Sequence, residues 1–331
     1  MAVTVAGIDC GTNSIRLMIA RVDGTGVTVL VPRIMRVVRL GQGVDKTRRF
    51  SQDALQRTFA AIDEFARILN GYDLDGIRFV ATSATRDARN RNEFEDYVYS
   101  RLGVRPDVIP GEEEARLSFL GATSVVDTSA HQAPYLVMDL GGGSTELVLG
   151  GDGRSIPVTD VSQAYSMDTG SVRISERHLL SDPPDDRQIA RAADDVNAAI
   201  DTACAAVDIS RTGTFIGVSG TVTTMASVAL GLSTYDRDAV DGALLDISRI
   251  YEADSAVLHM DRAKRGSLGV IHPGRLDVIG AGALIFTEVL KRVSLSVQSR
   301  GRELSTVMVS EHGLLDGIVR DLGIKLLAGK G

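Results

Sequence analysis

The chain has 331 residues, of which 44% are hydrophobic and 24% are charged, and its formal net charge is −7. This balance is typical of ordered globular proteins and excludes an intrinsically disordered chain. The length predicts about two domains of roughly 150 residues each, and the acidic charge argues against a protein that coats nucleic acid.

The cysteine and hydropathy patterns indicate a reducing compartment. Cys10 and Cys204 are too few for a disulfide framework or a cysteine-rich zinc site, and none of the five histidines has metal-ligand or triad spacing. No run of about 18 apolar residues predicts a membrane helix. The first residues lead directly into a strand-like segment, without the basic start of a signal peptide. We therefore expect a cytoplasmic protein with no membrane partner and no nucleic-acid partner.

The first part of the chain is predicted to form a three-stranded meander followed by alternating helices and strands. An apolar strand at Val3–Ile8 precedes a second apolar strand and a third β-rich segment at Val27–Leu40. A helix is expected at Ser51–Asn70, because apolar residues recur there every three or four positions and Gly71 follows. The elements expected next are strand Ile77–Ser83, helix Arg91–Leu102, strand Val104–Ile109 and helix Glu112–Ala122.

The rest of the chain is predicted to repeat this order after a hinge. The polar segment Val125–Pro134 is the hinge candidate, and a third β-rich segment of the second copy is expected at Ile156–Met167. Pro183 and Pro184 separate two helices. The later elements expected are helices Ser171–Leu180 and Asp185–Val207, strand Thr214–Ser219, helix Thr221–Leu230, further helices to Val293, strand Thr306–Val309 and helix Glu311–Leu322.

The two parts share a sequence repeat at a constant offset of 130 residues. Asp9-Cys-Gly-Thr-Asn13-Ser14 aligns with Asp139-Leu-Gly-Gly-Gly-Ser144, and in both copies the motif separates two apolar strands. The repeat predicts a duplicated α/β domain, in which a cleft between the halves would be the natural ligand site. Two facing turns of this kind could bind one phosphoryl group from both sides.

The second copy of the motif carries the strongest chemical signal. Its glycines, Gly141, Gly142 and Gly143, allow a tight turn that exposes several N–H groups to one small anion. Ser144 and Thr145 add hydroxyl donors, and Asp139 and Glu146 could face a magnesium ion across the same phosphate. The alternative is a tight glycine hairpin with Asp139 as a turn cap, which the repetition of the motif makes weaker.

Three further motifs are open to two interpretations each. Ser219-Gly220-Thr221 lies between a predicted strand and helix, where it could bind an anion or simply cap the helix. Arg86 follows a predicted strand and could clamp a phosphate, although a solvated arginine is more common. Glu114 lies in the first turn of a predicted helix, where acidic residues stabilise the helix dipole, and capping is favoured for it on the sequence alone.

Two stretches of the chain are rich in basic residues. Most of these side chains are expected to be solvated, but a longer polyanion would need such a path away from the glycine turn. The first stretch contains Arg33, Arg36, Arg39, Lys46, Arg48 and Arg49, and the second contains Arg262, Lys264, Arg265 and Arg275.

Together these motifs resemble the exopolyphosphatase/guanosine pentaphosphate phosphohydrolase (Ppx/GppA) family of the sugar kinase, Hsp70 and actin superfamily. The resemblance runs from about residue 3 to 322 and fits the short form of the family, without the C-terminal HD-like region. It implies two duplicated ribonuclease H-like domains with an interdomain cleft, formed by residues 1–124 with 311–331 and by residues 125–310. The motifs that carry it are Gly7–Ser14, Val38–Gly41, Ala81–Arg86, Gly111–Arg116, Asp139–Glu146 and Ser219–Thr223.

The resemblance also implies roles for individual residues. Glu114 corresponds to the catalytic base and Arg86 to the phosphate clamp. Asp139 and Glu146 correspond to the acids that support a magnesium ion, with manganese as the alternative metal. The phosphate-binding turns correspond to Asn13, Ser14, Gly141, Gly142, Gly143 and Ser144. A homodimer is an expectation from the family only.

The activity implied by the resemblance is a phosphoanhydride hydrolase. A water molecule activated by Glu114 would hydrolyse the terminal phosphoanhydride of inorganic polyphosphate and release orthophosphate. The main alternative is removal of the 5′-γ-phosphate of guanosine pentaphosphate, in which case the segment 219–224 could hold the nucleoside. A superfamily kinase and a non-catalytic nucleotide-binding protein of actin type are the less favoured alternatives.

Overall fold

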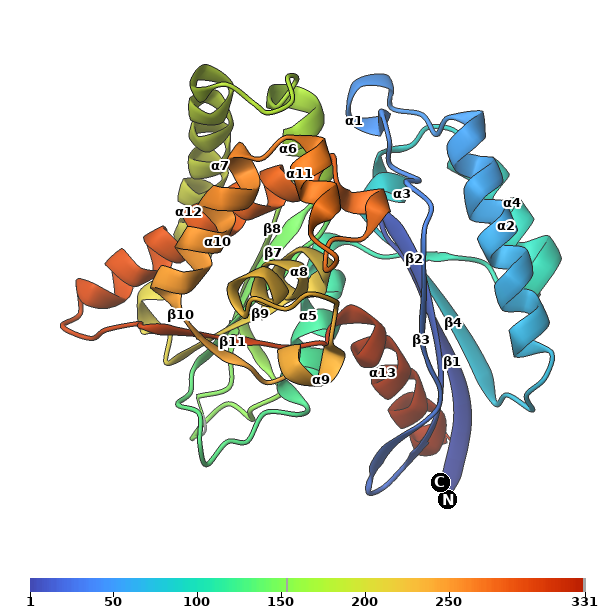
Figure 1. The fold of residues 1–331 in the computed structure, drawn as a ribbon. Helices are drawn as coiled ribbons and strands as arrows, with labels where there is room; N and C mark the ends of the chain where they lie inside the picture. The colour runs from blue at the N-terminus through green and yellow to red at the C-terminus, as the bar shows by residue number, and fades with distance from the viewer. Residues whose placement is uncertain (153, 330–331) are drawn as a thin grey trace. The chain divides into compact units, whose positions relative to one another are not determined.

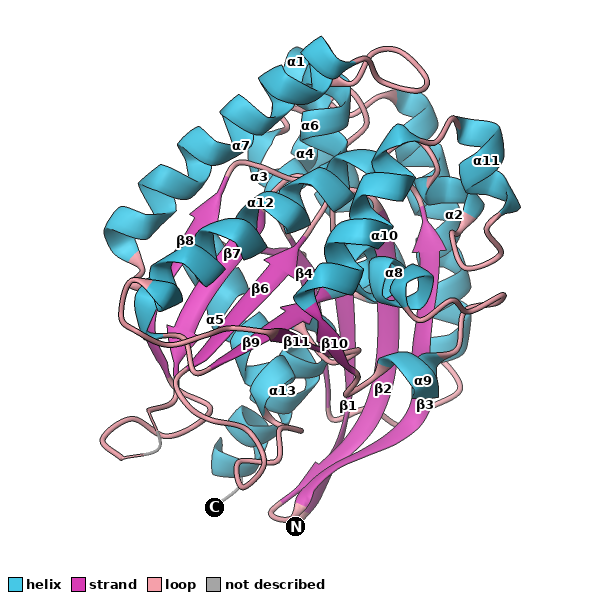
Figure 2. Cartoon of the chain, turned by 60° about the vertical axis from the view of Figure 1, so that its left-hand side comes forward, coloured by secondary structure: helices cyan, strands magenta, loops and turns pink. Residues whose placement is uncertain are grey.

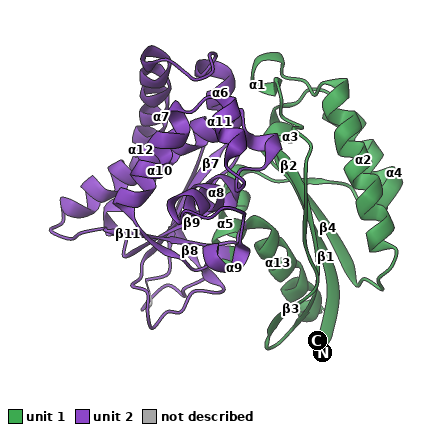
Figure 3. Ribbon diagram, viewed as in Figure 1, with its two compact units in different colours: residues 1–121, 314–331 green, residues 122–313 purple. Residues whose placement is uncertain are grey.

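In a computed structural model, which describes residues 1–152 and 154–329, the chain divides into two compact units (Figure 3). Unit 1 comprises Met1–Gly121 and Leu314–Gly331, and unit 2 comprises Ala122–Gly313. The limits predicted from the sequence lie between residues 124 and 125 and between residues 310 and 311. Across the described residues, every helix is too short or too polar to cross a membrane.

The described part of unit 1 contains one five-stranded sheet in the order β3-β2-β1-β4-β5. β1, β2 and β3 form an antiparallel meander, and β4 and β5 run parallel to β1. The strands are β1 (Ala2–Cys10), β2 (Ser14–Asp23), β3 (Gly26–Val37), β4 (Gly76–Ala81) and β5 (Asp107–Val108).

Helices cover both faces of this sheet (Figure 1). Because side chains alternate along a strand, Ala6 and Ile8 of β1 pack in one core with α2, whereas Val3 and Val5 pack in another with α13. α2 begins after Ser51, whose hydroxyl accepts a hydrogen bond from the Ala54 N–H. The helices are α1 (Val44–Thr47), α2 (Gln52–Leu69), α3 (Ser83–Asp87), α4 (Arg91–Leu102), α5 (Gly111–Thr123) and α13 (Leu314–Gly329).

Unit 2 has the same core topology with one strand added at the edge of the described sheet. The order is β10-β11-β9-β6-β7-β8, in which β6, β7 and β8 form the antiparallel meander and β9 and β11 run parallel to β6. The strands are β6 (Tyr135–Leu140), β7 (Thr145–Gly150), β8 (Val161–Met167), β9 (Thr214–Val218), β10 (Leu244–Asp246) and β11 (Thr306–Val309).

The helices of unit 2 surround one large apolar core. α8, α10 and α12 lie over one face of the sheet (Figure 2), and α12 contributes a nearly continuous row of buried side chains to the core. The helices are α6 (Ser171–His178), α7 (Asp186–Ala206), α8 (Ser219–Ala229), α9 (Arg237–Val240), α10 (Ile247–His259), α11 (Arg262–Ser267) and α12 (Ile279–Gln298), with 3-10 turns at Ile209–Arg211 and Pro273–Arg275.

The duplicated meander with parallel strands beside it confirms the predicted pair of ribonuclease H-like domains. Three local predictions were wrong. Ser83–Asp87, predicted as the end of a strand and the residues after it, is the short helix α3. β10 lies in a region predicted to be helical, because its pairing with β11 is non-local. The last helix begins at Leu314 rather than at Glu311, whose backbone N–H donates to Asp241.

Candidate active site

The repeated sequence motif is also a repeated backbone turn. In unit 1 the Gly11 N–H donates to the Ser14 carbonyl over 3.0 Å, and in unit 2 the Gly141 N–H donates to the Ser144 carbonyl over 3.0 Å. Each turn connects two antiparallel strands in the same register, so that residue 9 pairs with residue 16 and residue 139 with residue 146. The predicted duplication therefore extends to individual hydrogen bonds.

In unit 2, the carbonyl groups of the three glycines are all bound on one side of the turn. Ser171 N–H donates to Gly141 O over 3.1 Å and Val172 N–H donates to Gly142 O over 2.8 Å, both from the start of α6. The third carbonyl, that of Gly143, accepts from Arg173 Nε over 2.9 Å.

This arrangement directs N–H groups to the opposite side of the turn. The carbonyl and N–H of a trans peptide point in opposite directions, so the N–H groups of Gly142, Gly143 and Ser144 face away from α6. Within the described residues these three N–H groups make no hydrogen bond. Successive N–H groups of this kind can bind a small anion such as phosphate, and phosphate binding by this turn stays a prediction.

Two neighbouring residues hold the turn in place. A side chain at Gly170 would place its Cβ 2.5 Å from the Gly142 carbonyl carbon, so the close approach of α6 requires glycine there. The Thr145 hydroxyl is fully buried and donates to the Thr169 carbonyl over 2.6 Å. Its single proton is used in that bond, and phosphate binding by Thr145 stays a prediction.

The predicted metal-supporting acids lie opposite each other on β6 and β7. Asp139 is 8% exposed and Glu146 is 1% exposed, and as directly paired residues they project from the same face of the sheet. Ser166 Oγ donates to Glu146 Oε1 over 2.7 Å. No group of three or more histidine, cysteine or acidic side chains in residues 1–152 and 154–329 could hold a metal. Two carboxylates nevertheless fit magnesium, which commonly takes one or two carboxylates together with substrate phosphates and water.

In unit 1, the equivalent turn contains a buried asparagine amide whose N–H donor has no acceptor among the described residues. Asn13 is 7% exposed, its carbonyl accepts from the Val38 and Arg39 N–H groups, and its side-chain Nδ2 has no hydrogen-bond partner. A buried donor left without an acceptor costs about 1–3 kcal/mol. An anion at this position would offset that cost, which fits the predicted phosphate-binding role of Asn13. Ser14, its neighbour, is also buried.

The structure pairs the predicted base with the predicted clamp. Glu114 on α5 is 7% exposed, and its Oε2 lies 2.8 Å from Arg86 Nη1 on α3. The same Nη1 donates to the Ile109 carbonyl over 2.8 Å. Within the described residues, Nε and Nη2 of Arg86 make no hydrogen bond. Arg86 is therefore not a solvated arginine, and two of its nitrogens remain available to a phosphate.

The neighbouring glutamate on α5 has a different, structural role. Glu113 accepts two hydrogen bonds from Arg116, at 2.7 and 2.8 Å, and one from Arg78. The pKa of Glu113 is lowered, mainly because Arg116 donates hydrogen bonds to its carboxylate. Burial has a smaller effect in the opposite direction. Both arginines also pair with Asp321 of α13, so this network attaches the last helix to unit 1. Glu114 is thus distinguished from Glu113 by its partner.

The segment Ser219–Thr221 forms the start of α8. Ser219 has a φ of 79°, a left-handed value that is strained for a residue with a side chain. A Cβ at Gly220 would lie 2.2 Å from Arg275 Nη2, and Thr221 packs against Gly282 of α12. The turn therefore places a buried guanidinium against the N-terminus of an 11-residue helix. This arrangement suits an anion, and anion binding by Ser219, Gly220 and Thr221 stays a prediction.

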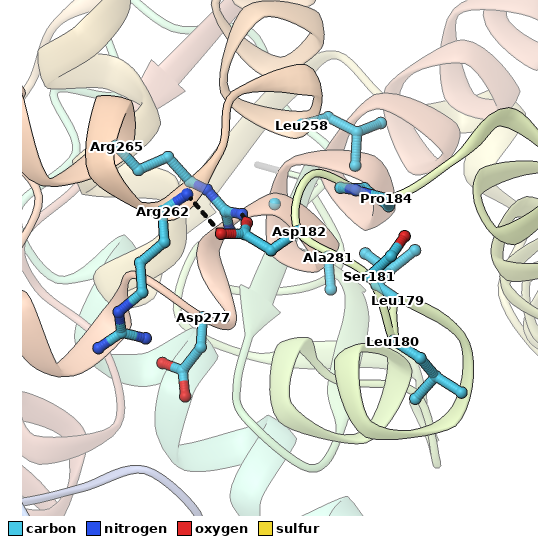
Figure 4. A pocket seen from close by; sticks show the side chains of 11 residues that line it. Leu179, Leu180, Ser181, Asp182, Pro184, Leu258, Arg262, Arg265, Asp277 and Ala281 are labelled. Atoms are coloured by element: carbon cyan, nitrogen blue, oxygen red, sulfur yellow. Dashed lines mark hydrogen bonds and ion pairs between the residues drawn. The ribbon is translucent and has the colours of Figure 1, made fainter.

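A pocket of about 160 Å³ in unit 2 is lined by none of the predicted site residues (Figure 4). Arg265 lines it and is buried, and its guanidinium donates to Asp182 over 2.5 Å and to the Leu276 carbonyl over 2.6 Å. The Arg262 backbone N–H donates to the other oxygen of Asp182. Part of the second basic stretch is therefore structural rather than a path for a polyanion.

Comparison with known proteins agrees with this geometry. The profile of the Ppx/GppA phosphatase family matches residues 18–321. The chain belongs to the Ppx/GppA phosphatase family. All the predicted site residues except Asn13 and Ser14 lie inside the matched range.

Several relatives match over most or part of the chain. Exopolyphosphatase 2 of Mycobacterium tuberculosis is 40% identical over 331 residues, which cover 97% of this chain and 99% of that protein. The crystal structure of an exopolyphosphatase-like protein has a TM-score of 0.97 and 58% identity, and the match covers 98% of this chain and 99% of that one. A guanosine-5′-triphosphate,3′-diphosphate pyrophosphatase of Pseudoalteromonas atlantica is 35% identical over 196 residues, 59% of this chain and 37% of that protein.

Proposed function

We propose that the chain is an exopolyphosphatase, which hydrolyses the terminal phosphoanhydride of inorganic polyphosphate and releases one orthophosphate per turnover. The observation that carries this proposal is the Gly141–Ser144 turn, whose glycine carbonyls are all bound on one side. On the other side, the N–H groups of Gly142, Gly143 and Ser144 make no hydrogen bond within the described residues. The full-length similarity to a protein named exopolyphosphatase 2 supports it.

The proposed roles follow from the contacts within each unit. The N–H groups of Gly142, Gly143 and Ser144 would bind oxygens of the terminal phosphoryl group, and Asn13 Nδ2 would donate to another. Nε and Nη2 of Arg86 would neutralise part of the phosphate charge. Glu114 would accept a proton from water as the water oxygen attacks phosphorus, and the remaining chain would leave with the electrons of the broken P–O bond.

The carboxylates of Asp139 and Glu146 would hold a magnesium ion, or manganese in its place. Two buried carboxylates that project from the same face of a sheet fit a divalent cation with a preference for oxygen ligands. When bound, such an ion neutralises charge on phosphate oxygens. The side chains of Asp139 and Glu146 would also orient the glycine turn that lies between these two residues in the sequence.

Guanosine pentaphosphate is the second candidate substrate, because relatives named guanosine-5′-triphosphate,3′-diphosphate pyrophosphatases match part of the chain. The same phosphate-binding turn would serve either substrate. We place the protein in the cytoplasm, since Cys10 and Cys204 are both free thiols, as expected in a reducing compartment. A homodimer is proposed from the family alone.

The test is a phosphate-release assay with magnesium on short polyphosphate, long polyphosphate, guanosine pentaphosphate and ATP. Glu114→Gln should lower kcat by about 10²–10⁴-fold, the usual scale of general-base catalysis, while substrate still binds. Glu112→Gln is the matched control, because Glu112 is the exposed glutamate in the same helical turn. Turnover of Glu114→Gln close to that of the unmodified protein would remove Glu114 from the role of base.

A further inference from the structure

Two segments of unit 1 that are about 40 residues apart in the sequence are joined by hydrogen bonds. The Arg89 N–H donates to the Arg48 carbonyl over 2.9 Å. The Phe50 N–H donates to Asn90 Oδ1 over 2.8 Å, and Asn90 Nδ2 donates back to the Phe50 carbonyl over 3.2 Å. The loop after α1 and the loop between α3 and α4 therefore form one surface.

This surface concentrates positive charge on an otherwise acidic protein. We define the basic surface as Lys46, Arg48, Arg49 and Arg89, whose residues are all exposed. Arg48 pairs with Asp87 at 3.3 Å. Within residues 1–152 and 154–329, no acidic side chain forms an ion pair with the other three cations. The formal net charge of the whole chain is −7, so the charge here is a local exception.

Arg36, from the same sequence stretch, is already neutralised. Arg36 donates through Nε to Glu64 Oε2 over 2.9 Å, and its Nη2 contacts the other oxygen of the same carboxylate. The basic stretch seen in the sequence therefore divides in the structure. Arg36 forms an ion pair. Lys46, Arg48 and Arg49 combine with Arg89 into a surface on which, among the described residues, Arg48 alone has an acidic partner.

The backbone of Arg48, in the basic surface, has an unfavourable conformation. Arg48 ends α1 with a φ of 56°, in the left-handed region. That conformation costs a residue with a Cβ about 1–2 kcal/mol, and glycine would avoid the cost. The chain has an arginine there, whose guanidinium contacts Asp87.

The basic surface begins next to the predicted phosphate clamp. Arg86 and Asp87 are consecutive residues of α3, and Arg86 contacts Glu114 whereas Asp87 contacts Arg48. Asp87, the residue next to the arginine that is proposed to neutralise the reacting phosphoryl group, therefore contacts the basic surface through Arg48.

We propose that the basic surface binds the distal phosphates of a polyphosphate chain whose terminal phosphate occupies the proposed active site. This inference rests on the proposed function. A flexible linear polyanion can follow exposed point charges, and each contact gains free energy from the release of counterions. A single-stranded nucleic acid fits less well, because the aromatic residue of these two loops, Phe50, is buried and offers no stacking surface.

The experiment measures binding rather than turnover, in the Glu114→Gln protein and without added metal. Dissociation constants for long polyphosphate and for tripolyphosphate are determined at several salt concentrations. The test variant carries Lys46→Gln, Arg49→Gln and Arg89→Gln. The control variant carries Arg187→Gln, Arg191→Gln and Arg249→Gln, three exposed cations of unit 2 that have no ion-pair partner in the described residues and give the same change in net charge.

The test variant should bind long polyphosphate about tenfold more weakly and tripolyphosphate within about twofold of its parent. The slope of log Kd against log salt should fall by about 2, because each contact to a single-stranded polyanion contributes about 0.7. The control variant should change neither value. Equal weakening by both variants, or equal losses for long and short chains, would overturn the proposal.

A single-stranded oligonucleotide of the same charge serves as a further probe. If it binds as tightly as long polyphosphate and loses as much affinity in the test variant, the surface binds nucleic acid and the proposal is wrong. Failure of the proposed function would be seen separately, as an absence of phosphate release by the protein that retains Glu114. The binding contrast between long and short chains is measured without that activity.

Discussion

The two copies of the glycine-containing turn share a backbone hydrogen bond and a strand register, and they differ in the charge of the residue opposite the aspartate. In unit 1, Asp9 pairs across the strands with Arg16, and the two side chains form an ion pair at 3.0 Å. In unit 2, Asp139 pairs across the strands with Glu146, so that two carboxylates occupy the equivalent positions. The first aspartate has a cation from its own chain, whereas the second is opposite another acid.

This difference shows how one scaffold can supply two electrostatic environments. Both pairs are largely removed from water; the first brings opposite charges together, and the second brings two like charges together. The second pair therefore suits an external divalent cation, and the first does not. The duplicated turn would then provide phosphate donors in both units but a metal-supporting face in unit 2 alone.

Among the changes that test this comparison, the largest expected effect comes from making the second turn resemble the first. Glu146→Arg would place a guanidinium opposite Asp139, as Arg16 is placed opposite Asp9. We expect kcat for phosphate release to fall by about 10²–10³-fold, because the several kcal/mol supplied by a metal ion would be lost. Glu146→Gln, which keeps the shape of the side chain, should instead shift the magnesium titration to higher concentration. Unchanged titrations in both variants would count against a metal site here.

The reverse change should make the first turn resemble the second. Arg16→Glu would place two carboxylates together, and we expect the free energy of unfolding to fall by about 3 kcal/mol, as when a buried ion pair loses one partner. Magnesium chloride should restore part of this loss in Arg16→Glu but none in Arg16→Ala. Urea titrations with and without the metal measure the difference. Equal responses of the two variants to magnesium would show that paired carboxylates in this register do not bind it.

The predictable part of the fold is the part whose signals are local. The helix Arg91–Leu102 and the strand Thr306–Val309 have the predicted bounds, and α2 begins directly after the capping residue Ser51. β10 was missed because three residues become a strand only through pairing with β11, which lies some 60 residues later. Non-local pairing leaves no periodicity in a single sequence.

The candidate site follows the same division. The two turns could be predicted from the repeat, because a constant offset between two similar motifs is visible in the sequence. The contact between Arg86 and Glu114 was not predictable, since the sequence favoured a solvated arginine and a capping glutamate. Arg173 was missed altogether. It donates a hydrogen bond to a backbone carbonyl 30 residues away, and no side-chain motif predicts such a contact.

The smallest of the expected effects comes from substituting Arg173, which fixes the position of the second turn. The first turn has its Asn13 carbonyl bound by backbone N–H groups, whereas the Gly143 carbonyl depends on the buried side chain of Arg173. Arg173→Gln should raise KM about tenfold with a smaller change in kcat, since one buried hydrogen bond contributes about 1.4 kcal/mol. Arg177→Gln, on the same helix but paired with Asp195, is the control. A lower melting temperature with an unchanged KM would show that Arg173 stabilises unit 2 without orienting the phosphate-binding N–H groups.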